Sequence, residues 1–213
     1  MIISVLNLKG GVGKTTLSTN LAYCLQTRNN RVLLVDSDPQ GSARDWHSNG
    51  NGEMLEVIGL DRPTLCKDID RLHGRYDFII IDGAPHLTSM AIQSLLCSDV
   101  ILIPVQPSPY DVWASRTLVD LVKQRQEVTN GRPFAAFVVS GQIVGTNIGK
   151  EVRDVLSEYG LPVFESGTCM RVGYPETAAI GQTVLDGNYP NAQAEIELIA
   201  NELEAFINER FKN

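Results

Sequence analysis

The chain has 213 residues, of which 43% are hydrophobic and 20% are charged. This length and composition fit a single globular domain, residues 1–213, with a sizeable core better than two small domains. The formal net charge of −7 argues against a generally basic, DNA-coating surface, so any contact with nucleic acid must be local.

Five short apolar runs, rich in β-branched residues, alternate along the chain with stretches of helix length. They cover residues 2–7, 31–36, 77–82, 99–105 and 134–140. Continuous apolarity indicates that both faces of each strand are covered, and the strand–helix–strand order indicates parallel pairing. The predicted fold is therefore an α/β three-layer sandwich with a doubly wound, mostly parallel sheet. Ligands of this fold bind at the carboxyl ends of the strands.

The first run leads into KGGVGKTT, residues 9–16, at a junction between a strand and a helix. Glycines let the backbone fold around phosphate oxygens, and the start of the following helix favours negative charge. Lys14 is expected to reach the β- and γ-phosphates, and the Thr15 hydroxyl to bind Mg²⁺. The expected nucleotide-binding residues of this loop are Lys9, Gly10, Gly11, Val12, Gly13, Lys14, Thr15 and Thr16.

The loop departs from the usual phosphate loop, which has a glycine where Leu8 stands, and a GxGxxG motif fails at Thr16. KGGVGKTT resembles the deviant phosphate loop of the ParA/MinD group of ATPases. The resemblance covers nearly the whole chain, is strongest over residues 1–115, and is closest to the short ParF-type plasmid-partition proteins. It implies ATP and Mg²⁺ as cofactors. It also implies that Lys9 crosses the interface of an ATP-bound homodimer and acts on the partner's nucleotide, as an arginine finger does.

Carboxylates follow the second and third runs. Asp36 and Asp38 in VDSDPQGS could form only a polar turn, and Asp82 could cap a helix. Beside a phosphate loop in a parallel sheet, however, they would face the nucleotide. The resemblance implies that Asp36 and Asp82 serve the Mg²⁺ together with Thr15. It also implies that Asp38 orients the attacking water, which makes Lys9, Lys14 and Asp38 the expected catalytic residues.

Two later segments are less specific. In PVQPSPYDVWAS, residues 104–115, Ser108 and Pro109 read as the start of a helix, so Asp111 could be a helix-start residue only. The resemblance instead implies that Pro107 and Asp111 lie at the dimer interface near the nucleotide. Residues 170–186, beginning at Met170, resemble the family segment that closes over the base. No NKxD guanine signature follows the fifth run, which favours adenine.

Rival functions can be weighed on the same sequence. No apolar run approaches the roughly 18 residues of a membrane-spanning helix, and no charged leader is present, so we expect a cytoplasmic protein. Near the C-terminus a helical apolar stripe lies beside Glu195, Glu197, Glu202, Glu204 and Glu209. Such an acidic face disfavours binding to a membrane, so we expect this helix to pack on the domain. The stripe consists of Ile196, Ile199, Leu203, Phe206 and Ile207. An iron–sulfur carrier is disfavoured because the four cysteines include no suitable pair.

The resemblance implies a plasmid-partition ATPase. Mg-ATP would drive dimerisation and non-specific binding to nucleoid DNA, and a small centromere-binding partner would stimulate slow hydrolysis. Because the sequence starts at the phosphate-loop strand, we expect that separate partner to recognise the operator. The alternatives are an ATP-gated scaffold and a related switch that positions a protein cargo, such as a chemoreceptor cluster or a microcompartment. Candidate DNA contacts are Arg116, Lys123, Lys150, Arg153 and Arg171. Of these, Lys150 and Arg153 lie on a predicted helix whose apolar face is Ile148, Val152, Val155 and Tyr159.

Overall fold

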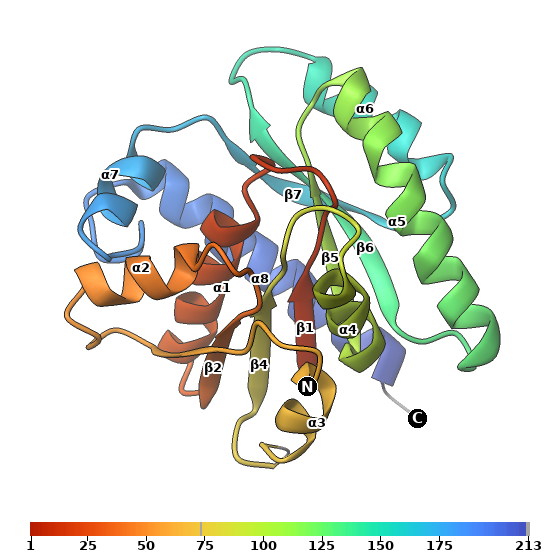
Figure 1. Ribbon diagram of the computed structural model, residues 1–213. Helices are drawn as coiled ribbons and strands as arrows, with labels where there is room; N and C mark the ends of the chain where they lie inside the picture. Colours follow the sequence, from red (N-terminus) through yellow and green to blue (C-terminus); the bar gives the residue numbers. More distant parts are fainter. Residues whose placement is uncertain (73, 212–213) are drawn as a thin grey trace.

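The computed structural model describes residues 1–72 and 74–211, and within them the strands form a single sheet. Its order is β3-β2-β4-β1-β5-β6-β7, and all neighbouring strands are parallel. The strands are β1 Ile2–Val5, β2 Val32–Asp36, β3 Glu56–Gly59, β4 Phe78–Asp82, β5 Val100–Val105, β6 Phe134–Gln142 and β7 Val163–Cys169. The predicted doubly wound α/β sheet is confirmed, and its pairing is parallel throughout (Figure 1).

Helices cover both faces of this sheet. They are α1 Lys14–Thr27, α2 Ser42–Asn49, α3 Leu65–Asp70, α4 Ser89–Cys97, α5 Pro109–Val128, α6 Ile148–Ser157, α7 Gly173–Ala179 and α8 Pro190–Phe211. On one face, buried side chains of α1, α2 and α8 pack against the strands. On the other face, α3 and α4 pack at one side and α5 and α6 at the other. The three predicted layers are therefore present (Figure 1).

The two outer strands were not predicted from the sequence. In β3 the four residues are exposed or half-buried, and β7 carries the polar stretch ESGT at its centre. Both strands lie at the edges of the sheet, where only one neighbour and partial burial are available. The continuous apolarity that marks a central strand is therefore missing from them.

The apolar face predicted around helix α6 is only partly the one that packs. The predicted apolar face was Ile148, Val152, Val155 and Tyr159. Val152 is buried, and Tyr159, just beyond the helix, packs against the same core. Ile148 and Val155 are 43% and 44% exposed, and the helix buries Leu156 in their place. The error arose because apolar residues occur on two sides of this short helix, so periodicity alone could not select the packed side.

The last helix packs on the sheet as expected. Ile196, Ile199 and Leu203 are fully buried in α8, and Phe206 is nearly so. Burial of each such side chain contributes about 1.5–3 kcal/mol to the stability of the fold. This face of α8 is therefore part of the hydrophobic core. None of the described helices is long and apolar enough to cross a membrane.

Candidate active site

The functional residues gather where β1, β2 and β4 end. Asp36 and Asp82 are direct neighbours in the register of β2 and β4, and Val5 pairs with Asp82 across β1 and β4. The phosphate loop leaves β1 at this same edge and enters α1 (Figure 1). The sheet therefore brings together the loop and the carboxylates that the sequence places some 20 to 70 residues apart.

Two glycines give the loop its shape. Gly11 and Gly13 have φ values of 76° and 87°, a region that favours glycine. A Cβ at Gly13 would also lie 2.8 Å from the Ser140 hydroxyl oxygen. Gly13 is the N-cap of α1, and the first turn of this helix has no acidic residue. The positive end of the helix dipole can therefore act on a phosphate group.

The loop is fastened from outside by residues that the sequence analysis did not single out. Ser140 of β6 donates its hydroxyl to the Val12 carbonyl at 2.7 Å. The Gln106 amide donates to the Gly11 carbonyl at 3.0 Å. Both bonds use carbonyl groups of the loop, so they fix its conformation and leave its N–H groups for a ligand.

Lys14 points into the site from the first turn of α1. It is only 8% exposed, and its ammonium donates to the Lys9 carbonyl at 2.9 Å. Burial lowers the pKa of Lys14, while the carboxylates of Asp82 and Asp38 act in the opposite direction. The Lys14 ammonium is thus a largely buried cation that lies near two carboxylates and a phosphate-binding loop. Such a group is suited to bind phosphate oxygens.

Asp82 is a buried charged group at the centre of the site. It accepts hydrogen bonds from Thr15 Oγ1 at 2.7 Å and Ser18 Oγ at 3.0 Å. Burial raises the pKa of Asp82 to about 7, and the nearby charge of Asp36 adds to this effect. A divalent cation beside Thr15 and Asp82 would relieve that cost. Ser18 has no motif of its own and was not predicted.

Asp36 is held by the chain that follows it. It is fully buried and accepts backbone N–H groups of Asp38 and Arg44, each at 3.0 Å. Burial raises the pKa of Asp36, and these N–H groups and the Arg44 charge counter it. Asp38 lies two residues further along the chain and is half-buried. Its carboxylate accepts the Gln40 N–H at 3.0 Å. The carboxylate of Asp38 is therefore oriented by its own loop.

The described residues contain no group of three or more His, Cys, Asp or Glu that could hold a metal by itself. Mg²⁺ is bound by one or two protein oxygens together with water and substrate phosphates. Thr15 and Asp82 supply two adjacent oxygens of the required kind. The residues present fit the predicted ion.

A cavity of about 310 Å³ adjoins the loop. Its lining residues include Gly11, Gly13, Thr16, Leu17, Gln106, Val138, Ser140, Gly141, Thr168, Cys169, Met170, Arg171, Tyr174 and Pro175. Met170 lies in this lining, and its predicted contact with the base stays a prediction. Pro107 is not among the lining residues, and its neighbour Gln106 is. Half of these residues come from β6, β7 and the start of α7, and they carry no local motif.

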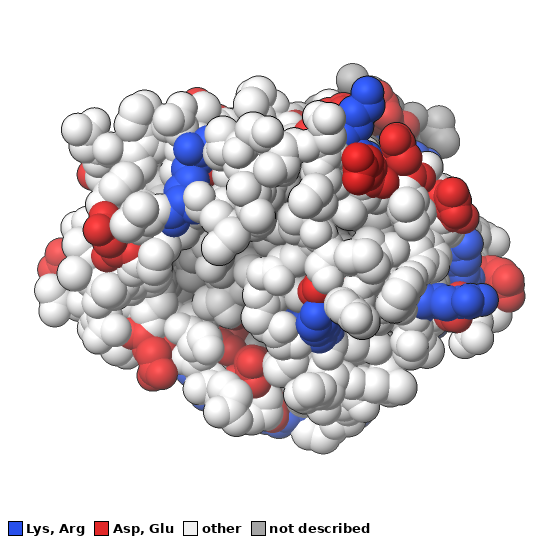
Figure 2. Space-filling model, turned by 90° about the horizontal axis from the view of Figure 1, so that it is seen from above, with Lys and Arg blue, Asp and Glu red and all other residues white. Residues whose placement is uncertain are grey.

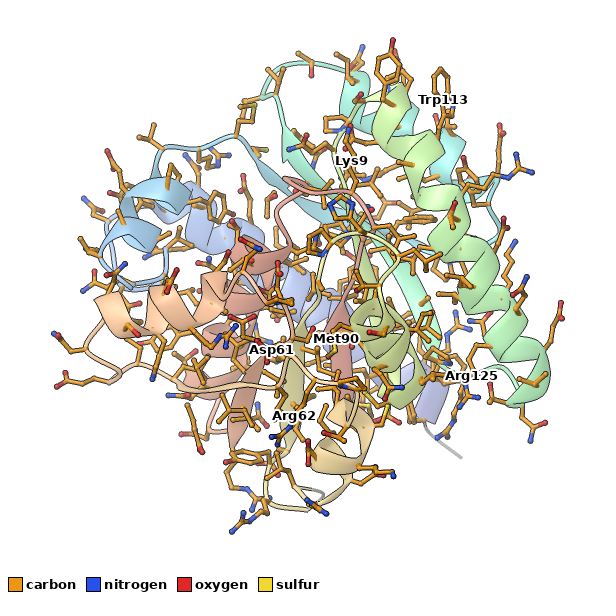
Figure 3. All side chains as sticks on the ribbon, in the orientation of Figure 1. Lys9, Asp61, Arg62, Met90, Trp113 and Arg125 are labelled. Atoms are coloured by element: carbon orange, nitrogen blue, oxygen red, sulfur yellow. The ribbon has the colours of Figure 1, made fainter. Side chains whose placement is uncertain are left out.

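Lys9 and Asp111 form an ion pair, with 2.7 Å between Lys9 Nζ and Asp111 Oδ2. The Asp111 side chain is 4% exposed and that of Lys9 is 39% exposed. Helix α5 begins at Pro109 with Ser108 as N-cap, as predicted, but its cap makes no side-chain hydrogen bond, and the Asp111 carboxylate turns to Lys9. Figure 3 shows Lys9 near the end of α5 that carries Trp113, far from Arg125.

Comparisons with known proteins identify the kind of protein that carries this site. A sequence model described as an AAA domain matches residues 1–55 and 48–132. The "Maintenance of carboxysome distribution protein A" of Halothiobacillus neapolitanus is 34% identical over 208 residues, which cover 94% of this chain and 95% of that protein. The chain belongs to the ParA/MinD family of ATPases. The sporulation initiation inhibitor protein Soj of Bacillus subtilis is 30% identical, covering 74% of this chain and 79% of Soj.

Solved structures share the fold of this ParA/MinD ATPase. MinD of Pyrococcus horikoshii with Mg-ADP has a TM-score of 0.76 and 20% identity, covering 100% of this chain and 99% of that chain. The ATP complex of a Cyanothece McdA variant has a TM-score of 0.77 and 16% identity, covering 95% and 96% of the two chains. The predicted enzyme class and cofactors, ATP and Mg²⁺, are confirmed. The closer likeness to ParF-type proteins stays a prediction.

The Lys9–Asp111 pair makes a testable contribution to the stability of this ParA/MinD ATPase. Within the described residues, Asp111 Oδ1 is buried without a hydrogen-bond partner. The ion pair with Lys9 is therefore the main interaction that offsets the cost of burying the Asp111 carboxylate. Lys9→Ala is expected to lower the free energy of unfolding by about 1 to 3 kcal/mol, because it leaves a buried charge unpaired. Adding Asp111→Asn should restore most of this loss. Thermal unfolding of the single and double variants measures both effects, and an unchanged midpoint in Lys9→Ala would contradict the pairing.

Proposed function

We propose that this chain is a positioning ATPase whose cargo is a protein assembly of the microcompartment kind. The observation that carries the proposal is the 34% identity, along nearly the full length of both chains, to a protein named for the maintenance of carboxysome distribution. A second protein of that name, from Gloeobacter kilaueensis, is 30% identical over 95% of this chain. The sequence alone favours plasmid partition, with a protein cargo as the alternative. These relatives favour the alternative.

The geometry supports a division of labour in hydrolysis. Thr15 and Asp82 would hold Mg²⁺, which when bound neutralises charge on the phosphates. The N–H groups of the loop and the Lys14 ammonium would bind the phosphate oxygens. Asp38 would hold a water in line with the γ-phosphate, because its carboxylate is fixed at the same edge of the sheet. Asp36 would orient the segment that carries Asp38 through the backbone N–H bond between them.

The position of Lys9 supports a site shared between two copies of the chain. Its side chain is 39% exposed at the rim of the site, although its partner Asp111 is buried. We propose that ATP binding brings two chains together and that Lys9 then leaves Asp111 for the nucleotide of the partner. Pro107, which lies between the loop-fastening Gln106 and α5, would form part of the same interface. Hydrolysis would then require dimerisation.

We propose that this ATPase binds nucleoid DNA while it positions its cargo. Two of the five candidate DNA contacts already bond to other residues of the same chain. Arg153 donates to the carbonyls of Phe164 and Glu165, and Arg171 pairs with Glu195. Three candidates are exposed, and they are Arg116, Lys123 and Lys150. Figure 2 shows Lys and Arg scattered over the upper face of the molecule without a continuous basic patch. On this face, a DNA-binding surface would require basic side chains from two chains.

We expect ATP-dependent, sequence-independent binding to duplex DNA. Each phosphate that is neutralised adds about −0.9 to the slope of log affinity against log salt, so two or three basic residues from each chain predict a slope of about −4 to −5. A salt titration with ATP, with ADP and without nucleotide measures this slope. Binding that is equal in all three states would show that ATP does not control the surface.

The cargo is tested in the source cell by deleting the gene for this chain. Fluorescent labels on a microcompartment shell protein and on a resident plasmid report the two candidate cargoes in the same cells. The proposal predicts that the shell assemblies cluster or lose their spacing while the plasmid is retained. Plasmid loss with evenly spaced assemblies would instead support partition, with a small centromere-binding partner in place of a cargo-linked one.

A further inference from the structure

One side of the cavity beside the phosphate loop is built by a segment with little apolar support. Cys169, at the end of β7, and Met170, Arg171 and Tyr174, which follow it, all line the cavity. Met170 is 72% exposed and Val172 is 68% exposed. Burial of side chains in the core therefore does not by itself hold residues 170–172 in place, and other contacts must do so.

A single carboxylate on α8 collects these contacts. Glu195 Oε1 accepts from Arg171 Nε at 2.6 Å. Glu195 Oε2 accepts from the backbone N–H of Cys169 at 3.1 Å and from the Tyr174 hydroxyl at 2.9 Å. The Glu195 side chain is only 11% exposed. Both oxygens of Glu195 are thus bonded to residues of the cavity wall.

The hydrogen bonds that Glu195 accepts belong to the charge-assisted class. Hydrogen bonds to an ionised carboxylate are shorter and stronger than those between neutral groups, and shielding from solvent strengthens them further. The Glu195 carboxylate raises the pKa of Arg171. It also adds to the effect of burial in raising the pKa of Tyr174. Helix α8 is anchored in the core by Ile196 and Ile199, so Glu195 ties the wall to a rigid element.

The sequence analysis counted Glu195 and Glu202 among the glutamates of a solvated acidic face. In the structure both turn toward the edge strand β7. Glu202, two helical turns beyond Glu195, accepts the N–H groups of Glu165 and Ser166 at 2.8 and 2.9 Å. These two N–H groups lie away from the cavity lining. The chain therefore offers two similar carboxylates on one helix, of which only Glu195 contacts the wall of the cavity.

We propose that Glu195 is a positioning residue that holds the cavity wall in shape for the base of the bound nucleotide. The inference rests on the proposed function as an ATPase, and on the expectation that the cavity lined by Met170 receives the base while the loop receives the phosphates. A wall that is already ordered lowers the entropic cost of binding. Glu195 therefore acts on the affinity for the whole nucleotide and leaves the affinity for the phosphate chain and the rate of phosphoryl transfer unchanged.

The test compares Glu195→Ala and Glu195→Gln with the matched control Glu202→Ala. Calorimetry gives the Kd for ATP and for inorganic tripolyphosphate, which has no base, and steady-state assays give KM and kcat. For Glu195→Ala we expect the Kd and KM for ATP to rise about tenfold, with tripolyphosphate affinity and kcat within about twofold of the unaltered protein. Glu195→Gln, which keeps the shape and one acceptor, should lie between. Thermal unfolding reports whether each variant is folded.

Three results would overturn the role of Glu195. The first is an unchanged affinity for ATP in Glu195→Ala. The second is an equal loss of affinity for ATP and for tripolyphosphate. The third is an equal loss of ATP affinity in Glu202→Ala, which would mean that both carboxylates only support helix packing. A different result would overturn the base site itself, and the inference with it: an unaltered protein that binds tripolyphosphate as tightly as ATP.

Discussion

Asp38→Ala is expected to bind Mg-ATP as tightly as the unaltered protein and to hydrolyse it about 10² to 10³ times more slowly. The phosphate loop, Lys14 and the Thr15–Asp82 pair do not depend on the Asp38 side chain for their hydrogen bonds. The carboxylate of Asp38 is oriented by the Gln40 N–H at the same edge of the sheet. Removal of this carboxylate would therefore leave the attacking water unpositioned, while the phosphate-binding residues would keep their geometry.

Lys14→Ala is the matched opposite of this variant. It removes the buried ammonium from the cradle, so we expect the affinity for ATP itself to fall, whereas Asp120→Ala, an exposed carboxylate on α5, should change neither property. Single-turnover hydrolysis and equilibrium binding separate the two effects. If Asp38→Ala and Lys14→Ala bound and hydrolysed ATP equally, the assignment of these two roles would be wrong.

Lys9→Ala is expected to lower hydrolysis by about 10³-fold and to impair ATP-dependent dimerisation, because a cation near the transferring phosphoryl group is worth that much in related chemistry. The variant also loses the partner of Asp111, so its loss of activity needs a control for stability. Lys9→Ala combined with Asp111→Asn supplies it. This double variant should recover stability and remain inactive.

Sedimentation with ATP and Mg²⁺, run beside steady-state hydrolysis, measures both effects of Lys9→Ala. A double variant that regained hydrolysis together with its stability would show that Lys9 serves only to neutralise Asp111. Unchanged turnover and assembly in the single variant would remove Lys9 from the catalytic residues altogether.

The central part of the fold and of the site could be predicted because its signals are local. The strand, the glycine-rich loop and the helix follow one another within 27 residues, and Asp36 and Asp82 stand directly at the ends of apolar runs. Parallel pairing then places these ends side by side. No contact between distant residues had to be known in advance.

The remainder depends on contacts between distant residues, which leave no local pattern. Ser140 fastens the loop from 128 positions away, and Glu195 fastens the cavity wall from a helix that reads only as amphipathic. Gly83 is another case. A Cβ there would lie 2.2 Å from a methyl carbon of Leu6, so the close approach of two loops, and not the turn at Gly83, requires the glycine. Sequence periodicity carries no information on such approaches.

The claim that the active site is shared between two chains is tested most directly by mixing Lys9→Ala with Asp38→Ala. Each variant alone should be nearly inactive. In a mixed dimer, the site of the Lys9→Ala chain keeps its own Asp38 and receives Lys9 from the other chain. Random pairing at equal amounts puts half of the chains in mixed dimers with one intact site each, so hydrolysis should return to about a quarter of the unaltered rate. A mixture no more active than the sum of the two separate variants would contradict a shared site.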